Sequence, residues 1–460
     1  MRDLIHILLI VLVSPPGILA QGLFESSVTT SETKPLPFEL SGYGRGVAYL
    51  GEYSMPSSSE IKSAFGEASL RINAFSGDLG RLYSDLRFRS GFEYNNRINE
   101  FQVREAYGDV YLGNFELRAG QAIIAWGRTD AANPTNNLTP QDYFVRSPEP
   151  DDMRLGNFLL RGRYSILPQL RLEAVWVPVY KYSTYRFDLF EMPDLIVFSE
   201  SPLPAATINN GSIAAKIDFL FNRFDGSLSW FNGFDPMPGI QAGEIPGSPS
   251  GEMIIDMYAR AFRQQTLGLD FSFGLGSFGV RGEAAFRDPA PEYREQVFAP
   301  QRDLRYVLET DRSFGDFNLM LMYMGQYVFD FTDIPVQGGI PDIDPMQFQD
   351  PALLAMLGAM MEQEVAGFNR IIFDQTNEIT YTLGLRPSLT MFHGVSKIEV
   401  FGMYNFSTDE WGLFPRLTWD VTDNIKLSFG GQYFKGAVNT RYDLIAPVFN
   451  SGFFELKYSF

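Results

Sequence analysis

The last nine residues of the chain, Gly452–Phe460, read GFFELKYSF. One set of alternate positions is apolar: Phe454, Leu456, Tyr458 and Phe460. The positions between them are mostly polar: Phe453, Glu455, Lys457 and Ser459. Because successive side chains of a strand point to opposite faces, this pattern predicts a strand with one apolar face and one largely polar face. A final strand leaves backbone groups unpaired unless it closes onto the first strand of a barrel.

An alternating terminal strand that ends in Phe460 resembles the last strand of bacterial outer-membrane barrels, where it is the assembly signal. The resemblance implies a place in the cell outer membrane and recognition by the barrel-assembly machinery through Phe460. It also implies contact with outer-membrane lipid and lipopolysaccharide. If the strand closes a barrel, we expect the chain before it to consist of more strands of the same kind.

The amino terminus has the layout of a secretory signal peptide. Arg2 precedes an apolar run over 4–13, and Ala20 offers a small residue before Gln21. The run is too short to span a membrane as a helix, so we predict a signal peptide over 1–20. An interfacial anchor that stays attached is the alternative. Residues 21–38 are rich in Ser, Thr, Glu and Pro and predict a periplasmic tail without a core, ahead of a barrel over 39–460.

Composition narrows the class of protein. The chain has 15% aromatic residues, no cysteine and a formal net charge of −18. Because phosphate binding needs a basic surface, nucleic acid is not an expected partner. No stretch after the amino-terminal run approaches the roughly 20 apolar residues of a membrane helix.

From Glu39 onward, segments of about ten residues alternate between apolar and polar side chains, which is typical of membrane barrels. We predict strands at about 39–51, 62–75, 80–93, 100–112, 115–125, 157–165, 169–179, 208–221, 225–234, 265–274, 278–287, 303–313, 316–329, 377–388, 395–406, 411–420, 424–435 and 450–460. The expected fold is therefore all-β, a transmembrane antiparallel up-and-down barrel of about 18 strands, an even count as in single-chain barrels.

The connections test this fold independently. Every second one is tight: 76–79, 113–114, 166–168, 222–224, 275–277, 314–315, 389–394 and 421–423. The others are mostly long: 126–156, 180–207, 235–264, 288–302 and 330–376. Short periplasmic turns and long extracellular loops are the layout of outer-membrane barrels. Trp126, Trp176, Trp411 and Trp419 fall near strand ends, where aromatic girdles are expected. A soluble β-helix or sandwich needs neither feature.

Histidine-dependent and cysteine-dependent catalysis is excluded by composition. The chain has no cysteine, His6 leaves with the signal peptide, and His393 lies in a predicted periplasmic turn. No Ser-His or Cys-His nucleophile and no histidine metal site can form. Carboxylates are plentiful, but no spacing singles out a catalytic pair. We therefore expect no enzyme activity, no catalytic or metal-binding residue and no cofactor.

Arginines gather on the polar face of the first seven strands. Those assigned to the pore wall are Arg71, Arg81, Arg87, Arg89, Arg118, Arg161 and Arg163. Acidic residues are interleaved with them on the same face. Two readings stay open: a charged wall that attracts anionic solutes, or opposite charges that pair across strands and brace the wall.

The loop after the fifth strand, with the last residue of that strand, reads AWGRTDAANPTNNLTPQDYFVRSPEPDDMRLG over 125–156. Its WG ending, NP…L-x-P-x-D segment and D-x-R-x-G return resemble a stretch in porin-like families of Gram-negative outer membranes. In related large barrels such a loop folds inward and narrows the pore. By that resemblance the constriction candidates are Trp126, Arg128, Asn133, Pro134, Asp142, Tyr143, Asp152 and Arg154. The alternative is a loop that covers the mouth for stability alone.

The connection over 330–376 holds the one helical signal. Asp350 can cap a helix, Pro351 suits its first position, and Leu and Met recur at helical spacing through PALLAMLGAMMEQEVAGF. This short extracellular helix could serve as a plug, a lid or a first contact for an apolar solute. It could also pack on the other outer loops.

Together these patterns predict a porin-like channel for passive or gated passage of small or anionic and amphipathic solutes. One alternative is a surface barrel that binds partners through its acidic loops. Another is an exporter of an acidic polysaccharide, similar to alginate-type export barrels. The oligomeric state stays open.

Overall fold

The computed structural model of the chain describes residues 38–53, 58–94, 96–130, 132–190, 196–243, 255–334 and 351–460. The predicted signal peptide over 1–20 lies outside these residues, and so does the predicted tail except for Phe38, the first residue of the first strand.

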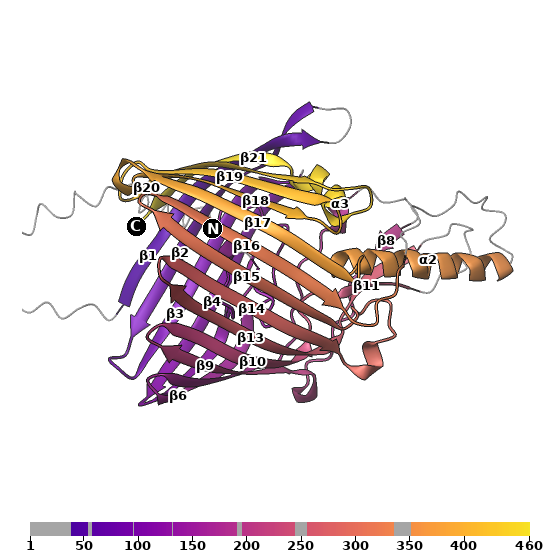
Figure 1. Cartoon of the computed structure of the whole chain (residues 1–460), viewed down its shortest axis with the longest axis horizontal. Coiled ribbons are helices and arrows are strands. Elements are labelled where there is room, and N and C mark those ends of the chain that lie inside the picture. Colours follow the sequence, from indigo (N-terminus) through magenta and orange to yellow (C-terminus); the bar gives the residue numbers. More distant parts are fainter. Residues whose placement is uncertain are drawn as a thin grey trace, which may run out of the picture. The chain divides into compact units, whose positions relative to one another are not determined.

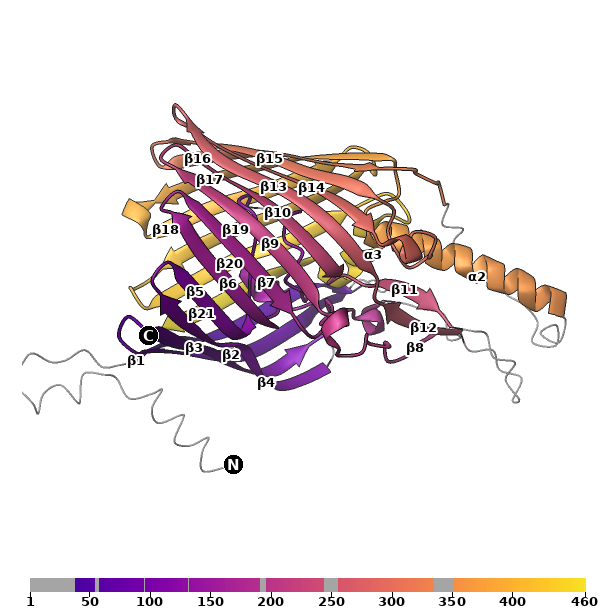
Figure 2. The same cartoon turned by 90° about the horizontal axis from the view of Figure 1, so that it is seen from below.

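Eighteen antiparallel strands form one closed sheet (Figures 1 and 2). Each strand pairs with the next one in the sheet along the chain, and the first also pairs with the last. In chain order they are β1 (Phe38–Tyr53), β2 (Ser58–Phe75), β3 (Gly80–Glu93), β4 (Asn96–Leu112), β5 (Phe115–Ala122), β6 (Asn157–Leu167), β7 (Leu170–Val177), β9 (Ser212–Phe221), β10 (Phe224–Phe234), β13 (Arg263–Leu275), β14 (Phe278–Pro289), β15 (Asp303–Phe314), β16 (Phe317–Val328), β17 (Ile379–Met391), β18 (Ser396–Asn405), β19 (Glu410–Asp420), β20 (Ile425–Lys435) and β21 (Ser451–Ser459). The predicted eighteen-strand up-and-down barrel is confirmed.

The alternation of side chains sorts apolar groups to the outside of the barrel and polar groups to the inside. On β13, Leu267 and Leu269 are 57% and 45% exposed, whereas Thr266 and Asp270 are 2% and 3% exposed. A soluble β-protein has the opposite arrangement. An apolar exterior with a polar interior suits a wall surrounded by lipid hydrocarbon.

The barrel closes between β1 and β21, as the terminal strand predicts. Arg45 lies opposite Lys457 in the ladder, and its Nη1 is 3.5 Å from Oε1 of Glu455. Phe460 and Gly42 exchange backbone hydrogen bonds of 3.0 Å in both directions. The terminal residue therefore takes part in the ladder that closes the barrel.

Connection lengths separate the two ends of the barrel. One end carries the tight turns, such as 113–114 between β4 and β5 and 276–277 between β13 and β14. The other carries the long connections that follow β5, β7, β10 and β16, and we call it the long-loop end. In the orientation of outer-membrane barrels this end is extracellular.

A small sheet at the long-loop end was not predicted. It consists of β8 (Ile196–Phe198), β11 (Gly239–Ala242) and β12 (Ile255–Arg260), strands too short to show a clear period in the sequence. The predicted helix is present as α2 (Pro351–Ile372). Its Met361 and Val365 are buried against Ile240, Ile255 and Met257 of this sheet, so part of its apolar face packs on other loops (Figure 1).

A second helix, α3 (Arg441–Phe449), also unpredicted, connects β20 to β21. Short 3-10 helices lie at Pro150–Met153, Phe187–Leu189, Ile208–Asn210, Pro291–Tyr293 and Phe392–Gly394. Within the described residues, neither helix has the length and apolar character needed to cross a membrane.

Candidate functional site in the barrel interior

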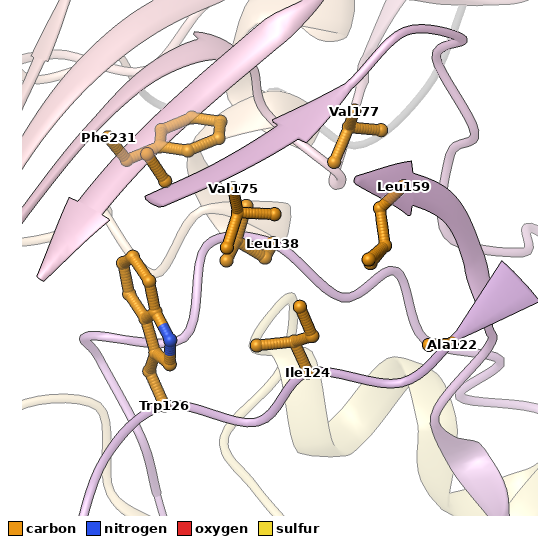
Figure 3. Packing of buried hydrophobic residues seen from close by; sticks show 9 residues of the cluster. Ala122, Ile124, Trp126, Leu138, Leu159, Val175, Val177 and Phe231 are labelled. Atoms are coloured by element: carbon orange, nitrogen blue, oxygen red, sulfur yellow. The ribbon is translucent and has the colours of Figure 1, made fainter. Parts of the chain in front are cut away.

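The connection between β5 and β6, described at residues 123–130 and 132–156, packs side chains against inward-facing residues of the neighbouring strands, and Figure 3 shows these side chains together. Its side chains Ile124, Trp126 and Leu138 form an apolar cluster with inward-facing residues of five strands, Ala122, Leu159, Val175, Val177, Ala214 and Phe231. The neighbours of Leu159 on β6 point outward, since Phe158 is 60% exposed. The apolar cluster therefore holds the first part of this connection inside the barrel. We call the connection the inward loop.

Trp126 is a correction to the expected aromatic girdle. Its side chain is buried, at 4% exposure, and its Nε1–H donates a 2.8 Å hydrogen bond to Oε1 of Glu173 on β7. A girdle residue would face lipid, whereas this indole faces the interior and fixes the start of the inward loop.

Two buried carboxylates of the far wall hold the segment 128–135. Glu283 on β14 accepts five hydrogen bonds of 2.5–3.1 Å from this segment: from the backbone N–H groups of Arg128 and Thr129, the hydroxyls of Thr129 and Thr135, and the amide of Asn133. Glu309 on β15 accepts hydrogen bonds of 2.9 and 3.0 Å from the backbone N–H of Asp130. We call this pair the carboxylate anchor. A buried carboxylate is stable only when donors surround it, so the segment and the anchor stabilise each other.

Gly127 explains the WG pair at the start of the loop. Its φ is +108°, and a Cβ placed there would lie 2.5 Å from Oε1 of Glu283 and 2.8 Å from Nδ2 of Asn133. The absence of a side chain therefore lets the backbone approach the carboxylate closely enough to donate to it.

Three arginines of the near wall converge on the other end of the loop. The carboxylate of Asp152 lies 2.8 Å from Nη2 of Arg45, 2.7 Å from Nη1 of Arg87 and 3.8 Å from Nη1 of Arg104. We call these three residues the arginine anchor. Burial by itself would raise the pKa of the Asp152 carboxyl, but Arg45 and Arg87, helped by a hydrogen bond from Ser147, hold that pKa well below its usual value.

Arg146 joins the inward loop to α3. It is 1% exposed and donates to the carbonyls of Val448 (2.5 Å) and Phe449 (3.3 Å), at the carboxyl end of that helix. Its own carbonyl accepts a hydrogen bond from Arg89 of β3. A cation at a helix carboxyl end also interacts favourably with the helix dipole.

The loop crosses the interior. In the eighteen-strand barrel, β17 is nine strands away from β5 in either direction, so it lies diametrically opposite β5. Asp130 of the loop forms an ion pair of 2.8 Å with Arg386 on β17 and one of 3.1 Å with Arg281 on β14. On a third side, Glu149 pairs with Arg416 of β19 at 3.0 Å.

All seven arginines predicted for the pore wall form ion pairs. Arg71 and Arg87 contact Asp85, and Arg81 and Arg118 share Asp109 at 2.8 and 2.7 Å. The other three pair as Arg89 with Glu67 and Glu93, Arg161 with Glu116, and Arg163 with Glu173. The side chains of Arg87, Arg89, Arg118 and Arg161 are at most 12% exposed. The cross-strand pairs of the bracing interpretation are therefore present, and a role of these residues in selectivity stays a prediction.

The residues predicted for the constriction have different surroundings in the structure: some hold the loop in place and others line a cavity. Arg128 (Nε to Asp270, 2.6 Å) and Asp152 hold the loop in place, and Asp142 accepts hydrogen bonds from the backbone N–H groups of Phe144 and Val145 in a local turn. Asn133, Pro134, Tyr143 and Arg154 line the cavity described next. Their effect on the pore radius stays a prediction.

A cavity of about 1490 Å³ lies between the inward loop, the long-loop end and the inner faces of β14–β20. Its lining includes fourteen aromatic residues: Tyr143, Phe144, Tyr185, Phe187, Phe190, Phe198, Tyr306, Phe368, Phe373, Phe401, Phe414, Phe434, Tyr442 and Phe449. Seven methionines also line it, including Met322 and Met403. Pockets for small molecules are usually concave and largely apolar with a few placed polar groups, so we take this cavity as the candidate binding region.

Sequence reasoning missed the residues that hold the loop. Glu283, Glu309, Arg104 and Arg45 are not among the residues that the sequence assigns to the pore wall or to the constriction. The alternation of β14 would have placed Glu283 in the lumen, but no local pattern tells which loop reaches it. In the described part of the chain, no cluster of three or more His, Cys, Asp and Glu side chains is arranged to hold a metal ion.

A closed barrel of eighteen antiparallel strands, apolar outside and crossed inside by a long loop, has the architecture of outer-membrane porins. No family model matches the sequence, and no curated protein matches it closely enough to count as a relative.

Solved structures share this architecture. They include Pseudomonas aeruginosa OccK9 (OpdG), with a TM-score of 0.54 and 10% identity over 92% of this chain and 97% of that one. Acinetobacter baumannii OccAB3 has a TM-score of 0.53 and 9% identity over 92% and 99% of the two chains. Pseudomonas aeruginosa OccK2 (OpdF), solved in complex with glucuronate, has a TM-score of 0.51 and 12% identity over 92% and 97%. At these identities the similarity establishes the fold.

Proposed function

We propose that this protein is an outer-membrane channel through which small solutes diffuse, narrowed by its inward loop. The observation that carries the proposal is the attachment of that loop to opposite walls of a closed eighteen-strand barrel, through Glu283 and Glu309 on one side and through Asp152 on the other. Barrels of sixteen to eighteen strands enclose an aqueous channel when nothing fills them. A loop fixed across that channel reduces its width without closing the cavity above it.

The size of the cavity supports a small solute. About 1490 Å³ is larger than an ordinary ligand pocket, so a sugar or a small amphipathic molecule would enter it with water. OccK2, a barrel of the same fold, has been solved with the small organic acid glucuronate.

Conductance tests the proposal. Full-length protein reconstituted in planar bilayers should give steady ohmic current steps. A variant with residues 128–154 replaced by a short Gly-Ser linker should give steps several-fold larger, because the loop no longer narrows the barrel. Heat-modifiable migration in gels would verify that both barrels are folded. Folded protein that conducts in neither form would overturn the proposal.

An exporter of an acidic polysaccharide is less well supported. Such a channel needs cationic groups that are free to meet the polymer, whereas the seven predicted pore-wall arginines are already paired with wall carboxylates.

A further inference from the structure

Six phenylalanines form a continuous row along the cavity, which we call the aromatic track: Phe401, Phe414, Phe434, Phe449, Phe144 and Phe190. Successive ring centroids are 5.8, 5.3, 6.3, 5.6 and 6.0 Å apart. The residues come from β18, β19, β20, the end of α3, the inward loop and the connection that follows β7. Only the tertiary structure brings them into one row.

The track is a lining and not a packed core. All six rings are half-buried, so each keeps part of its surface toward the cavity. Three of the five contacts are edge-to-face, at 72° to 84°, which leaves ring faces open along the row. Flat apolar faces at such spacing are suited to successive stacking by a ring that moves past them.

The charge of the lining argues against an anionic solute. Four arginines line the cavity, and each one already contacts a carboxylate: Arg154 with Asp151, Arg287 and Arg305 with Asp303, and Arg441 with Asp374. Seven carboxylate residues line it: Asp130, Asp151, Asp235, Glu364, Asp374, Glu410 and Asp443. Four positive and seven negative side chains give a formal charge of 4 − 7 = −3 for the described lining. An incoming carboxylate would meet engaged guanidinium groups and a negative field.

Hydrogen-bonding side chains lie close to the track along the chain. Asn405 is four residues from Phe401 on β18, Gln432 is two residues from Phe434 on β20, and both line the cavity. Asn405 already accepts through Oδ1 from the backbone N–H groups of Ser407 and Thr408, and Gln432 donates through Nε2 to the carbonyl of Phe449. The Nδ2 of Asn405 and the Oε1 of Gln432 are the amide atoms left to bond a solute hydroxyl.

We infer that the aromatic track is a stacking path for solutes with a flat ring and no negative charge, either pyranose sugars or neutral aromatic alcohols. The inference rests on the proposed function, because it names the solute class for the same barrel. The rings supply affinity that tolerates movement from one position to the next, and the acidic lining selects against carboxylates.

Binding measurements test this inference separately from conductance. Full-length protein in an uncharged polyoxyethylene detergent, which carries no sugar headgroup, is titrated in a calorimeter with maltotriose, benzyl alcohol or benzoate. We expect one or both neutral probes to bind more tightly than benzoate. We expect Phe434→Leu and Phe449→Leu, which keep apolar bulk but remove the ring, to weaken that binding about tenfold each, as stacking energies of this kind predict.

Phe429→Leu is the matched control, since Phe429 lies on β20 with Phe434 but is 43% exposed and contacts Phe454 on the outer face. It should bind like the native protein. If only maltotriose binds, the solutes are sugars. If only benzyl alcohol binds, the solutes are aromatic alcohols. Benzoate binding as tightly as the neutral probes, or track variants that bind like the control, would overturn the inference. If the barrel fails to conduct but shows the expected binding, the channel proposal fails and the binding site stands.

Discussion

Asp152 is the residue on which the near-wall attachment of the inward loop depends, because three wall arginines meet at its carboxylate. Arg45 and Arg87 are themselves buried, and each also has a partner on the wall: Arg45 pairs with Glu67 at 2.7 Å and Arg87 with Asp85 at 3.4 Å. Losing Asp152 therefore removes the contact with the loop and leaves the contacts within the wall.

We therefore expect Asp152→Asn to weaken the attachment of the loop by about 2 kcal/mol, the scale of a hydrogen bond to a charged group. Single-channel recordings should show larger and noisier current steps, because the loop then leaves its position for part of the time. Asp151→Asn is the control, since the Asp151 side chain is 78% exposed and pairs only with Arg154 among the described residues. Equal currents from the two variants would show that Asp152 does not hold the loop.

The depressed pKa of Asp152 makes a prediction about pH. A carboxyl whose pKa is lower in the folded state stabilises that state above its unfolded pKa, and loses this contribution as pH falls through the folded value. Since Arg45 and Arg87 hold the pKa of Asp152 well below its usual value, the attachment should persist from pH 7 down to about pH 4. Conductance of the native channel should show no increase between pH 7 and about pH 5, a range above the usual pKa of exposed carboxyl groups. Larger single-channel current steps already at about pH 5 would contradict the role of Asp152 in holding the loop.

At the scale of elements, the start of the inward loop depends on the close approach of its backbone to Glu283. Gly127→Ala places a Cβ 2.5 Å from that carboxylate and strains a positive φ, so the carboxylate anchor should open. We expect trypsin to cut the folded barrel within 128–146 faster than it cuts the native protein, as mass spectrometry of the fragments would reveal. Gly274→Ala on β13 is the control, because a Cβ there meets nothing within 4 Å. Equal rates of cleavage would mean that the close approach is not needed.

Local sequence patterns identified most strands, but they did not identify the residues against which the loops pack. The period of two placed all eighteen barrel strands, because alternation depends only on which side of the wall is lipid. The same rule could not find β8, β11 and β12, whose three to six residues pack on α2 instead of facing lipid. It also could not show that the apolar residues Ile124, Trp126 and Leu138 of the loop turn inward, since their partners come from β6, β7, β9 and β10.

At the scale of the molecule, the closing seam joins the two ends of the barrel. Phe460 contributes two backbone hydrogen bonds to Gly42, worth about 1 kcal/mol each, a small part of the stability of such a sheet. We propose that a large effect of its removal would come from assembly, as the resemblance of the terminal strand to those of outer-membrane barrels implies.

We expect deletion of Phe460 to reduce the amount of heat-modifiable barrel in the outer membrane several-fold, while the barrel that does form keeps nearly native thermal stability. Phe460→Tyr, which keeps an aromatic terminus, should assemble like the native chain. Normal assembly of the deletion variant would show that the terminal residue is not the signal.

The sequence by itself determined the wall of this protein: its strands, their approximate number, the side on which loops are long, and the strand that closes the barrel. These properties follow from side-chain alternation and turn length, which are local to each segment. Only the tertiary structure decided what the interior contains. Glu283 meets Gly127, Asp152 meets Arg45 and Arg87, and Phe401 joins a row that ends at Phe190, because strand register and barrel closure bring together residues far apart in the chain.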